Sequence, residues 1–293
     1  MTPMRFTPLA QFGLETYDVD LAQPLSDGAF AELEAALFRG QVLMVRAQHL
    51  TPAQFVAFAR RFGPPEPHVI DQFHHPEDPN ILILSNRQRD GKPVGLADAG
   101  TYFHTDYSYL AMPARATTLY SIEVPKRGGN TLFADQYAAY DDLPGAMKAM
   151  LAPLRAVHHY GNRKVAEHAA RTAASALTDD QKAKMPLITH AIVRPHPVTG
   201  RRALYAVSGS SYGIVGMRDE EAVALLDELA AHATQPKYVL GVAYGVGDVV
   251  VWDNASLLHS ATLVDPDDPR TLWRITIKET VAGADAVLAS TFA

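Results

Sequence analysis

From Tyr102 onward the sequence consists largely of short runs rich in threonine, tyrosine, valine and isoleucine. These residue types favour strands, and turn-forming residues separate the runs. Many short strands joined by turns are typical of a β-sandwich or a barrel. Turn residues at 196–200 and at 246–248 each predict a hairpin. The expected strands cover residues 117–124, 131–134, 156–159, 188–193, 203–207, 238–244, 249–252 and 273–277.

Helices are expected only around these strands. Capping residues and helical apolar spacing predict helices over about 28–39, 51–62, 137–150, 164–177 and 218–233. The apolar run Val42–Val45 predicts a buried strand between the first two. Proline- and glycine-containing segments on either side of a short strand at 81–85 predict long loops. We therefore expect a mainly β protein with flanking helices, forming one domain over 1–293 with a loop or lid region at 63–100.

Composition excludes several classes of function. Lysine and arginine number 26 against 32 aspartates and glutamates, a formal charge of −6 that disfavours nucleic acid as a partner. The chain has no cysteine, so any metal must be held by histidine, aspartate or glutamate. It has no stretch of 18 apolar residues and no signal-peptide pattern at its start, so we expect a cytoplasmic protein without a membrane partner.

Three residues form a candidate metal site. His104 and Asp106 are two positions apart, and on a strand they would point to the same face. His259 follows a buried-looking strand further along the chain. Two histidines and one carboxylate describe the facial triad of non-haem Fe(II) oxygenases. The alternative for His104 and Asp106 is an ordinary surface pair, or a histidine satisfied by a nearby carboxylate.

Two arginines lie in the stretch 270–277, whose alternation extends the last expected strand back to Arg270. Arg270 and Arg274 lie on one face of it, and the opposite face is apolar. An arginine inside a barrel needs an anionic partner, because an unpaired buried charge is costly. A bound dicarboxylate would supply one through a bidentate contact. The alternative is a structural salt bridge to Asp265, Asp267 or Asp268.

Five sequence blocks, taken in order, resemble the TauD/TfdA family of Fe(II)- and 2-oxoglutarate-dependent dioxygenases. The intervals of 27 residues from His104 to Thr131 and of 11 from His259 to Arg270 are similar to those of the family. The resemblance implies a double-stranded β-helix, a jelly-roll or cupin-like barrel. It also implies that His104, Asp106 and His259 hold the catalytic Fe(II), while Thr131 and Arg270 bind the distal carboxylate of 2-oxoglutarate. The blocks are Phe103–Asp106, Gly128–Phe133, Ala138–Pro144, His196–Gly200 and Gly247–His259.

The resemblance implies an oxidoreductase that uses O2 to hydroxylate a C–H bond of a small, anionic organic substrate, with succinate and CO2 as co-products. Because Asp106 is present, we expect oxygenation rather than halogenation. Candidate substrate-binding residues are Arg274, His68 and Tyr102, although Arg274 could instead orient a carboxylate near the cosubstrate. Gly100 stands where some members have a substrate-binding asparagine, which argues against taurine as the substrate.

The resemblance also implies an assembly state, whereas the residues alone leave competing functions open. Family members are often dimers or tetramers, so a homo-oligomer is expected. Two other functions stay open on the residues alone. One is a zinc-dependent hydrolase with the same ligands, and the other is a non-catalytic ligand-binding barrel. The hydrolase would have no need for a clamp made by Arg270 and Thr131.

Overall fold

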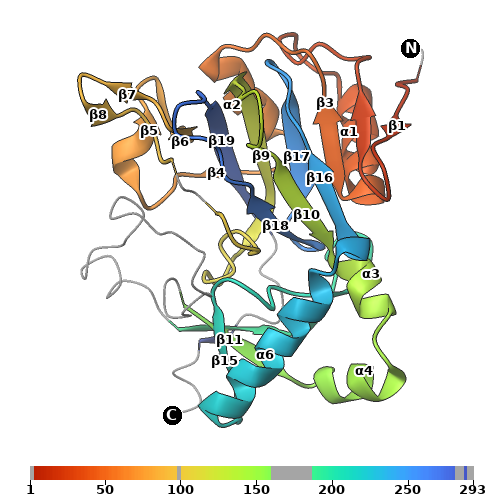
Figure 1. Ribbon diagram of the computed structural model, residues 1–293. Helices are drawn as coiled ribbons and strands as arrows, with labels where there is room; N and C mark the ends of the chain where they lie inside the picture. Colours follow the sequence, from red (N-terminus) through yellow and green to blue (C-terminus); the bar gives the residue numbers. More distant parts are fainter. Residues whose placement is uncertain (1–2, 98–99, 160–186, 281–286, 289–293) are drawn as a thin grey trace.

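Two sheets, whose strands pair mainly in antiparallel fashion, pack against each other at the centre of the protein (Figure 1). The computed structural model describes residues 3–97, 100–159, 187–280 and 287–288. Helices cover the outer sides of the sheets, so the expectation of a mainly β fold with flanking helices is confirmed. In the described residues no helix is long and apolar enough to cross a membrane.

The larger sheet has nine strands in the order β1-β2-β3-β17-β9-β19-β6-β5, with β4 also paired to β19. Among the described strands of this sheet, only β2 and β3 pair in parallel. Its central strands β3 and β17 are buried along their whole length, which explains their near-continuous valine-rich sequence. The bounds are β1 (Thr7–Pro8), β2 (Leu14–Thr16), β3 (Val42–Val45), β4 (Pro65–Glu66), β5 (His74–His75), β6 (Asp78–Ser85), β9 (Ala114–Glu123), β17 (Val249–Asp253) and β19 (Thr271–Lys278).

The smaller sheet has three strands, with β10 (Thr131–Asp135) between β16 (Val239–Val242) and β18 (Leu257–Ala261). One apolar core joins the two sheets. Phe133 and Leu240 reach it from the smaller sheet, and Leu119 and Trp252 from the larger. The candidate site residues lie between these sheets, as described below.

The turn at 246–248 does not form the expected hairpin. It joins β16 to β17, but β16 pairs with β10 whereas β17 pairs with β3 and β9. The chain therefore crosses from the smaller sheet to the larger one at this turn. Gly247 has a φ of 85°, and a Cβ there would lie 2.5 Å from the Gln48 carbonyl oxygen. The turn residues are thus explained by a close backbone approach and not by strand pairing.

The other expected hairpin is confirmed, because β13 (Val193–Pro195) and β14 (Arg202–Leu204) pair in antiparallel fashion across the turn at 196–200. A four-stranded sheet lies beside it in the order β15-β11-β12-β20. The strands β7 and β8 form a further small hairpin. The bounds of these strands are β7 (Gln88–Arg89), β8 (Lys92–Pro93), β11 (Arg155–His158), β12 (Ile188–Ala191), β15 (Ser211–Ile214) and β20 (Val287–Leu288).

The first two helices, α1 (Asp27–Gly40) and α2 (Pro52–Arg60), pack on the outer face of the larger sheet. Each begins where a side-chain cap was expected. The Ser26 hydroxyl accepts from the Ala29 amide, and Thr51 forms a capping box with Gln54.

The helices α3 (Gln136–Asp141), α4 (Gly145–Leu151) and α6 (Asp219–Ala233) lie at the opposite end of the molecule (Figure 1). The single helix expected over 137–150 is therefore divided into α3 and α4. Pro144 explains the break, because proline disfavours helical geometry in the residue that precedes it. The helix expected over 164–177 lies outside the described residues.

The region 63–100 holds more secondary structure than expected. It contains β4 to β8 and a short 3-10 helix, η1 (Asp71–Phe73), instead of a single short strand. The strand expected over 238–244 is shorter, since a second 3-10 helix, η3 (Pro236–Tyr238), leads into β16.

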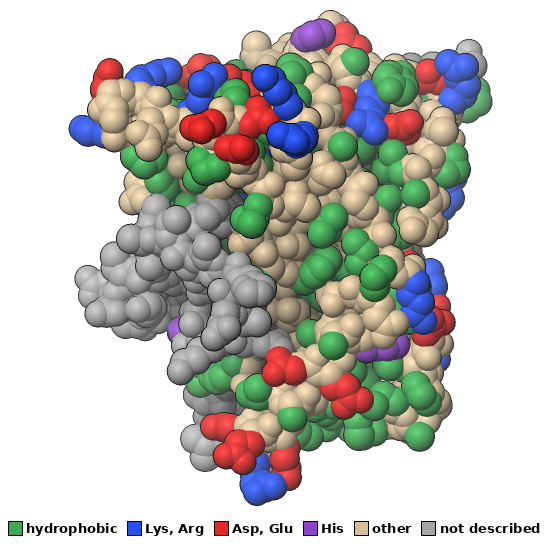
Figure 2. All heavy atoms as spheres, in the orientation of Figure 1, with side chains coloured by type: hydrophobic (Ala, Val, Ile, Leu, Met, Phe, Trp, Pro, Cys, Tyr) green, Lys and Arg blue, Asp and Glu red, His purple; other side chains and the backbone are tan. Residues whose placement is uncertain are grey.

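On the face drawn in Figure 2, basic and acidic side chains lie interspersed along the upper edge.

Candidate active site

The side chains of His104, Asp106 and His259 meet between the two sheets. One ligand atom from each lies within 4.8 Å of the others. The Asp106 carboxylate is central, with its oxygens 3.6 Å from His104 Nε2 and 3.5 Å from His259 Nε2. All three side chains are largely buried. The structure therefore brings together the three residues that the sequence analysis identified as metal ligands.

A backbone bridge places the two histidines opposite each other. The His104 amide donates to the His259 carbonyl at 3.0 Å, and the His259 amide donates back at 2.8 Å. The imidazole centroids are consequently 4.2 Å apart. His104 and Asp106 do not lie on one regular strand as expected, because after this single bridge the chain turns, with Tyr107 at a φ of 52°. The turn still directs the Asp106 carboxylate at both rings.

Hydrogen bonds orient two of the three side chains. His104 Nδ1 lies 2.8 Å from the Tyr102 carbonyl oxygen. A proton on Nδ1 would donate to that oxygen and leave the Nε2 lone pair directed at the site. On the opposite side of Asp106, the Thr117 hydroxyl donates to Oδ2 at 2.6 Å and accepts from the Asn254 amide at 3.0 Å. Both groups are fully buried, so the carboxylate is held in place.

The charge state of the site suits a metal cation. Burial alone would raise the pKa of the Asp106 carboxyl, but the nearby Arg274 guanidinium and the histidines together hold the pKa well below its ordinary value. Burial lowers the pKa of His259 well below its ordinary value, against the opposing effect of Asp106. An ionised carboxylate and a neutral imidazole are the forms that coordinate a metal.

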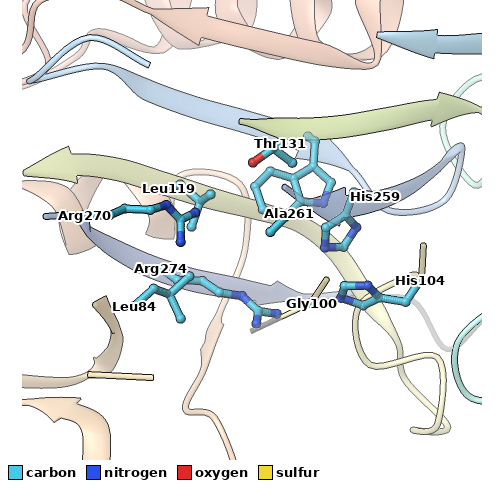
Figure 3. A pocket seen from close by; sticks show the side chains of 10 residues that line it. Leu84, Gly100, His104, Leu119, Thr131, His259, Ala261, Arg270 and Arg274 are labelled. Atoms are coloured by element: carbon cyan, nitrogen blue, oxygen red, sulfur yellow. The ribbon is translucent and has the colours of Figure 1, made fainter. Parts of the chain in front are cut away.

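Arg270 and Thr131 line the same pocket as the two histidines (Figure 3). Arg270 is 7% exposed, and its Nε has no hydrogen-bond partner in the described chain. No carboxylate of the described residues forms an ion pair with it. The expected alternative, a salt bridge to a nearby aspartate, is not formed: Asp268 accepts from the Lys126 amide and Asp265 from the Asp267 amide.

Arg274 has a carboxylate partner. Its Nη2 lies 2.6 Å from Asp106 Oδ1, and Figure 3 shows its guanidinium reaching toward the histidine pair. This contact agrees with the alternative interpretation, in which Arg274 orients a carboxylate near the cosubstrate. Its Nε, however, has no partner in the described chain, and the side chain lines the pocket. The arrangement leaves Arg274 able to bind an anion as well.

The two remaining candidates lie beside the pocket without lining it. The Tyr102 ring packs on the His104 ring at a centroid distance of 5.1 Å. The His68 ring packs on Tyr107 at 6.1 Å, and burial lowers the pKa of His68 to about 3. The roles of Tyr102 and His68 in substrate binding stay predictions.

Several site residues were missed in the sequence analysis. Thr117 and Asn254 hold Asp106, and Trp252 lines the pocket with its ring 4.7 Å from that of His259. Asn254 and Trp252 fall within one of the resembling sequence blocks, which was the only available signal for them. Thr117 lies on β9, which is buried on both faces, so its sequence shows no alternation of polar and apolar residues that would identify Thr117 as a site residue.

Gly209 packs directly against His104. Its φ is 87°, and a Cβ there would lie 2.6 Å from His104 Cβ and 3.2 Å from its Cα. Alanine at this position would have to displace a backbone segment that carries a ligand. We expect Gly209→Ala to weaken metal binding about 10-fold and to cost about 1–3 kcal/mol of unfolding free energy, measured by metal titration and thermal unfolding.

Gly216 provides the matched control. It has a similar φ of 75°, but a Cβ there would meet nothing within 4 Å. Gly216→Ala therefore introduces the same backbone strain without the clash. Equal metal affinities for the two alanine variants would contradict the account of Gly209.

Comparison with known proteins gives one consistent family. The protein-family model described as taurine catabolism dioxygenase TauD, TfdA family matches residues 5–276 of the sequence. The alpha-ketoglutarate-dependent 2,4-dichlorophenoxyacetate dioxygenase of Cupriavidus pinatubonensis is 34% identical over 279 residues, covering 92% of this chain and 94% of that protein. The (S)-phenoxypropionate/alpha-ketoglutarate-dioxygenase of Sphingobium herbicidovorans is 33% identical, covering 90% of this chain and 91% of that one.

Solved structures agree with these relatives. The structure of AAD-2 in complex with Mn(II) and N-oxalylglycine superposes with a TM-score of 0.81 at 30% identity, covering 97% of this chain and 100% of that one. A taurine dioxygenase from Burkholderia xenovorans gives a TM-score of 0.78 at 30% identity, covering 98% and 96% of the two chains. The jelly-roll expectation agrees with these neighbours.

Proposed function

The chain belongs to the taurine catabolism dioxygenase TauD, TfdA family, and from this premise we propose which of its residues bind iron, 2-oxoglutarate and substrate. The protein is a non-haem iron oxidoreductase that uses Fe(II), 2-oxoglutarate and O2 and acts on a small molecule. The observation that carries the residue assignment is the buried His-Asp-His triad in one pocket with an unpaired arginine.

We assign Fe(II) to His104, Asp106 and His259. Two imidazoles and one carboxylate match the ligand preference of this ion and leave further coordination positions open. Bound Fe(II) would supply the centre at which O2 is activated, so that a substrate C–H bond becomes C–OH while 2-oxoglutarate becomes succinate and CO2. Thr117 and Asn254 keep the carboxylate oriented, and the apolar wall formed by Leu84 and Leu119 restricts water.

We assign the distal carboxylate of 2-oxoglutarate to Arg270 and Thr131. A buried guanidinium without an anionic partner is unfavourable in the ligand-free protein. A dicarboxylate that accepts two hydrogen bonds from the guanidinium and one from the threonine hydroxyl would remove that penalty. Its 2-oxo acid end would then face the triad at the other end of the pocket (Figure 3).

The charges at the site favour an anionic substrate. Two guanidinium groups and one carboxylate leave one net positive charge, and Fe(II) would raise this to three. A 2-oxoglutarate dianion neutralises two of these charges, so one positive charge remains. The free Nε of Arg274 is a suitable donor for a monoanion. We propose a small carboxylate or sulfonate as substrate, and the named relatives favour aryloxyalkanoic acids as the first compounds to test.

The proposal is tested by release of succinate from 2-oxoglutarate in the presence of an aryloxyacetic acid and of its neutral methyl ester. Arg274→Lys keeps a positive charge beside Asp106 but loses the planar fork of donors. We expect this variant to raise the KM for the acid about 10- to 100-fold while the affinity for 2-oxoglutarate stays within about twofold. The ester should be a poor substrate for both proteins.

Two outcomes would contradict the anionic-substrate proposal. One is efficient turnover of the ester by the wild-type protein. The other is an unchanged KM for the acid in Arg274→Lys.

Four expectations about the whole chain also belong to this proposal. We propose that residues 1–293 form one dioxygenase domain and that the 63–100 region acts as a lid. In support of the lid, Gly100 at the end of this region lines the pocket. A homo-oligomer and a cytoplasmic location stay predictions.

A further inference from the structure

Tyr244 contacts the proposed cosubstrate site through Thr131. Its hydroxyl lies 2.6 Å from Thr131 Oγ1. Thr131 pairs with Val242 across β10 and β16, so Tyr244 follows the strand partner of Thr131 by two residues. The Tyr244 ring packs against the core between the sheets. The contact is therefore fixed by strand register on one side and by ring packing on the other.

The environment of Tyr244 keeps its hydroxyl protonated. Burial raises the pKa of this phenol to about 12, although the nearby Thr131 and Arg270 act in the opposite direction. Arg270, which lines the pocket with Thr131, is thus also a neighbour of Tyr244. The phenol carries a proton that it can donate, and Thr131 is the hydroxyl group within its reach.

Either oxygen of this pair can be the donor, and a bound carboxylate would select the arrangement in which Tyr244 donates to Thr131. A threonine oxygen that accepts from Tyr244 keeps its own proton free for the pocket. A carboxylate bound by Arg270 can only accept hydrogen bonds, so it would receive that proton. Donor polarity would then run from Tyr244 to Thr131 to the ligand, and each bond strengthens the next.

We propose that Tyr244 is a positioning residue that fixes the Thr131 hydroxyl as a donor to the distal carboxylate of 2-oxoglutarate and so helps to select the length of the 2-oxo acid. The inference rests on the proposed function, because it assumes that Arg270 and Thr131 bind this carboxylate. A donor that is held in place binds the carboxylate at one distance from the triad. A threonine hydroxyl that rotates freely would tolerate a longer acid better.

The test is Tyr244→Phe, which removes one oxygen atom and keeps the ring. Binding of 2-oxoglutarate and of the longer 2-oxoadipate is measured by calorimetry on the Mn(II)-loaded protein. We expect the Kd for 2-oxoglutarate to rise about 5- to 10-fold and the preference over 2-oxoadipate to fall. Affinity for Mn(II), and kcat at saturating 2-oxoglutarate, should change by less than about twofold.

A double-mutant cycle separates positioning from general damage. If Tyr244 acts through Thr131, the Kd of the Thr131→Val protein should rise by less than about twofold when Tyr244→Phe is added. Tyr238→Phe is the matched control, since its hydroxyl bonds to Asp142 at 2.8 Å and it does not line the pocket. This control should bind 2-oxoglutarate like the wild type.

Three results would overturn the inference. They are wild-type affinity in Tyr244→Phe, an equal loss in Tyr238→Phe, and independent effects of the two changes in the cycle. Failure of the proposed function looks different, because the Mn(II)-loaded wild-type protein would then bind neither acid.

Discussion

Asp106→Asn is expected to lower the affinity for Fe(II) by on the order of 100-fold or more and to abolish detectable hydroxylation. Residues that merely orient a ligand typically contribute 10- to 100-fold to metal affinity, so loss of the anionic ligand should cost at least as much. The change also leaves Arg274 without its partner at 2.6 Å. Removing one member of a buried ion pair typically costs about 3–5 kcal/mol, so the metal-free variant should unfold at a lower temperature.

Metal affinity has to be measured on folded protein for this prediction to be informative. Circular dichroism and thermal unfolding define the temperature range in which the Asp106→Asn protein is native. Asp265→Asn is a control at an exposed aspartate outside the triad, and it should bind Fe(II) like the wild type. Wild-type hydroxylation by folded Asp106→Asn would contradict the assignment of this residue as a ligand.

Arg270→Met is expected to have opposite effects on binding and on stability. The affinity for 2-oxoglutarate should fall by on the order of 100-fold, because a bidentate, charge-assisted contact is lost. The affinity for Fe(II) should be retained, since in the described part of the chain no ion pair or hydrogen bond joins the Arg270 side chain to the triad. The ligand-free protein should gain about 1 kcal/mol or more in unfolding free energy, because a buried cation without an anionic partner among the described residues is replaced by an apolar side chain.

A second arginine provides the control. Arg87 lines the neighbouring outer cavity together with Arg270, but it is exposed and pairs with Glu123 at 2.9 Å. Arg87→Met should leave both the 2-oxoglutarate affinity and the stability almost unchanged. The account of Arg270 would be wrong if Arg270→Met bound 2-oxoglutarate normally, or if it destabilised the ligand-free protein by several kcal/mol.

The parts of the fold that could be predicted depend on local signals. Val42–Val45 forms a strand with the expected bounds because a short apolar run between two helices leaves few alternatives. The helix α2 begins at Pro52 because Thr51 caps it. The turn at 246–248 was misassigned for the same reason: turn chemistry reports a tight bend, whereas the sheet that the next strand joins depends on distant residues.

The metal ligands were found from residue type and spacing, but their supports were not. His104 and His259 face each other through a backbone bridge between segments that are far apart in sequence. Gly209 and Thr117 act through contacts that also join distant segments. The lack of an ion pair at Arg270 among the described residues could not be predicted either. Three aspartates lie near it in sequence, but in the structure they form other hydrogen bonds or lie at the surface.

The most direct test of the account is an anaerobic titration of the wild-type protein with Fe(II) and 2-oxoglutarate, followed by visible absorption. We predict a weak charge-transfer band that appears only when both are present and that saturates at one 2-oxoglutarate per chain. In Arg270→Met the band should require far more 2-oxoglutarate. A wild-type protein that gives no band and yet binds Zn(II) tightly would contradict the assignment of Fe(II) and 2-oxoglutarate to this pocket and favour a hydrolytic or purely ligand-binding role for the same residues.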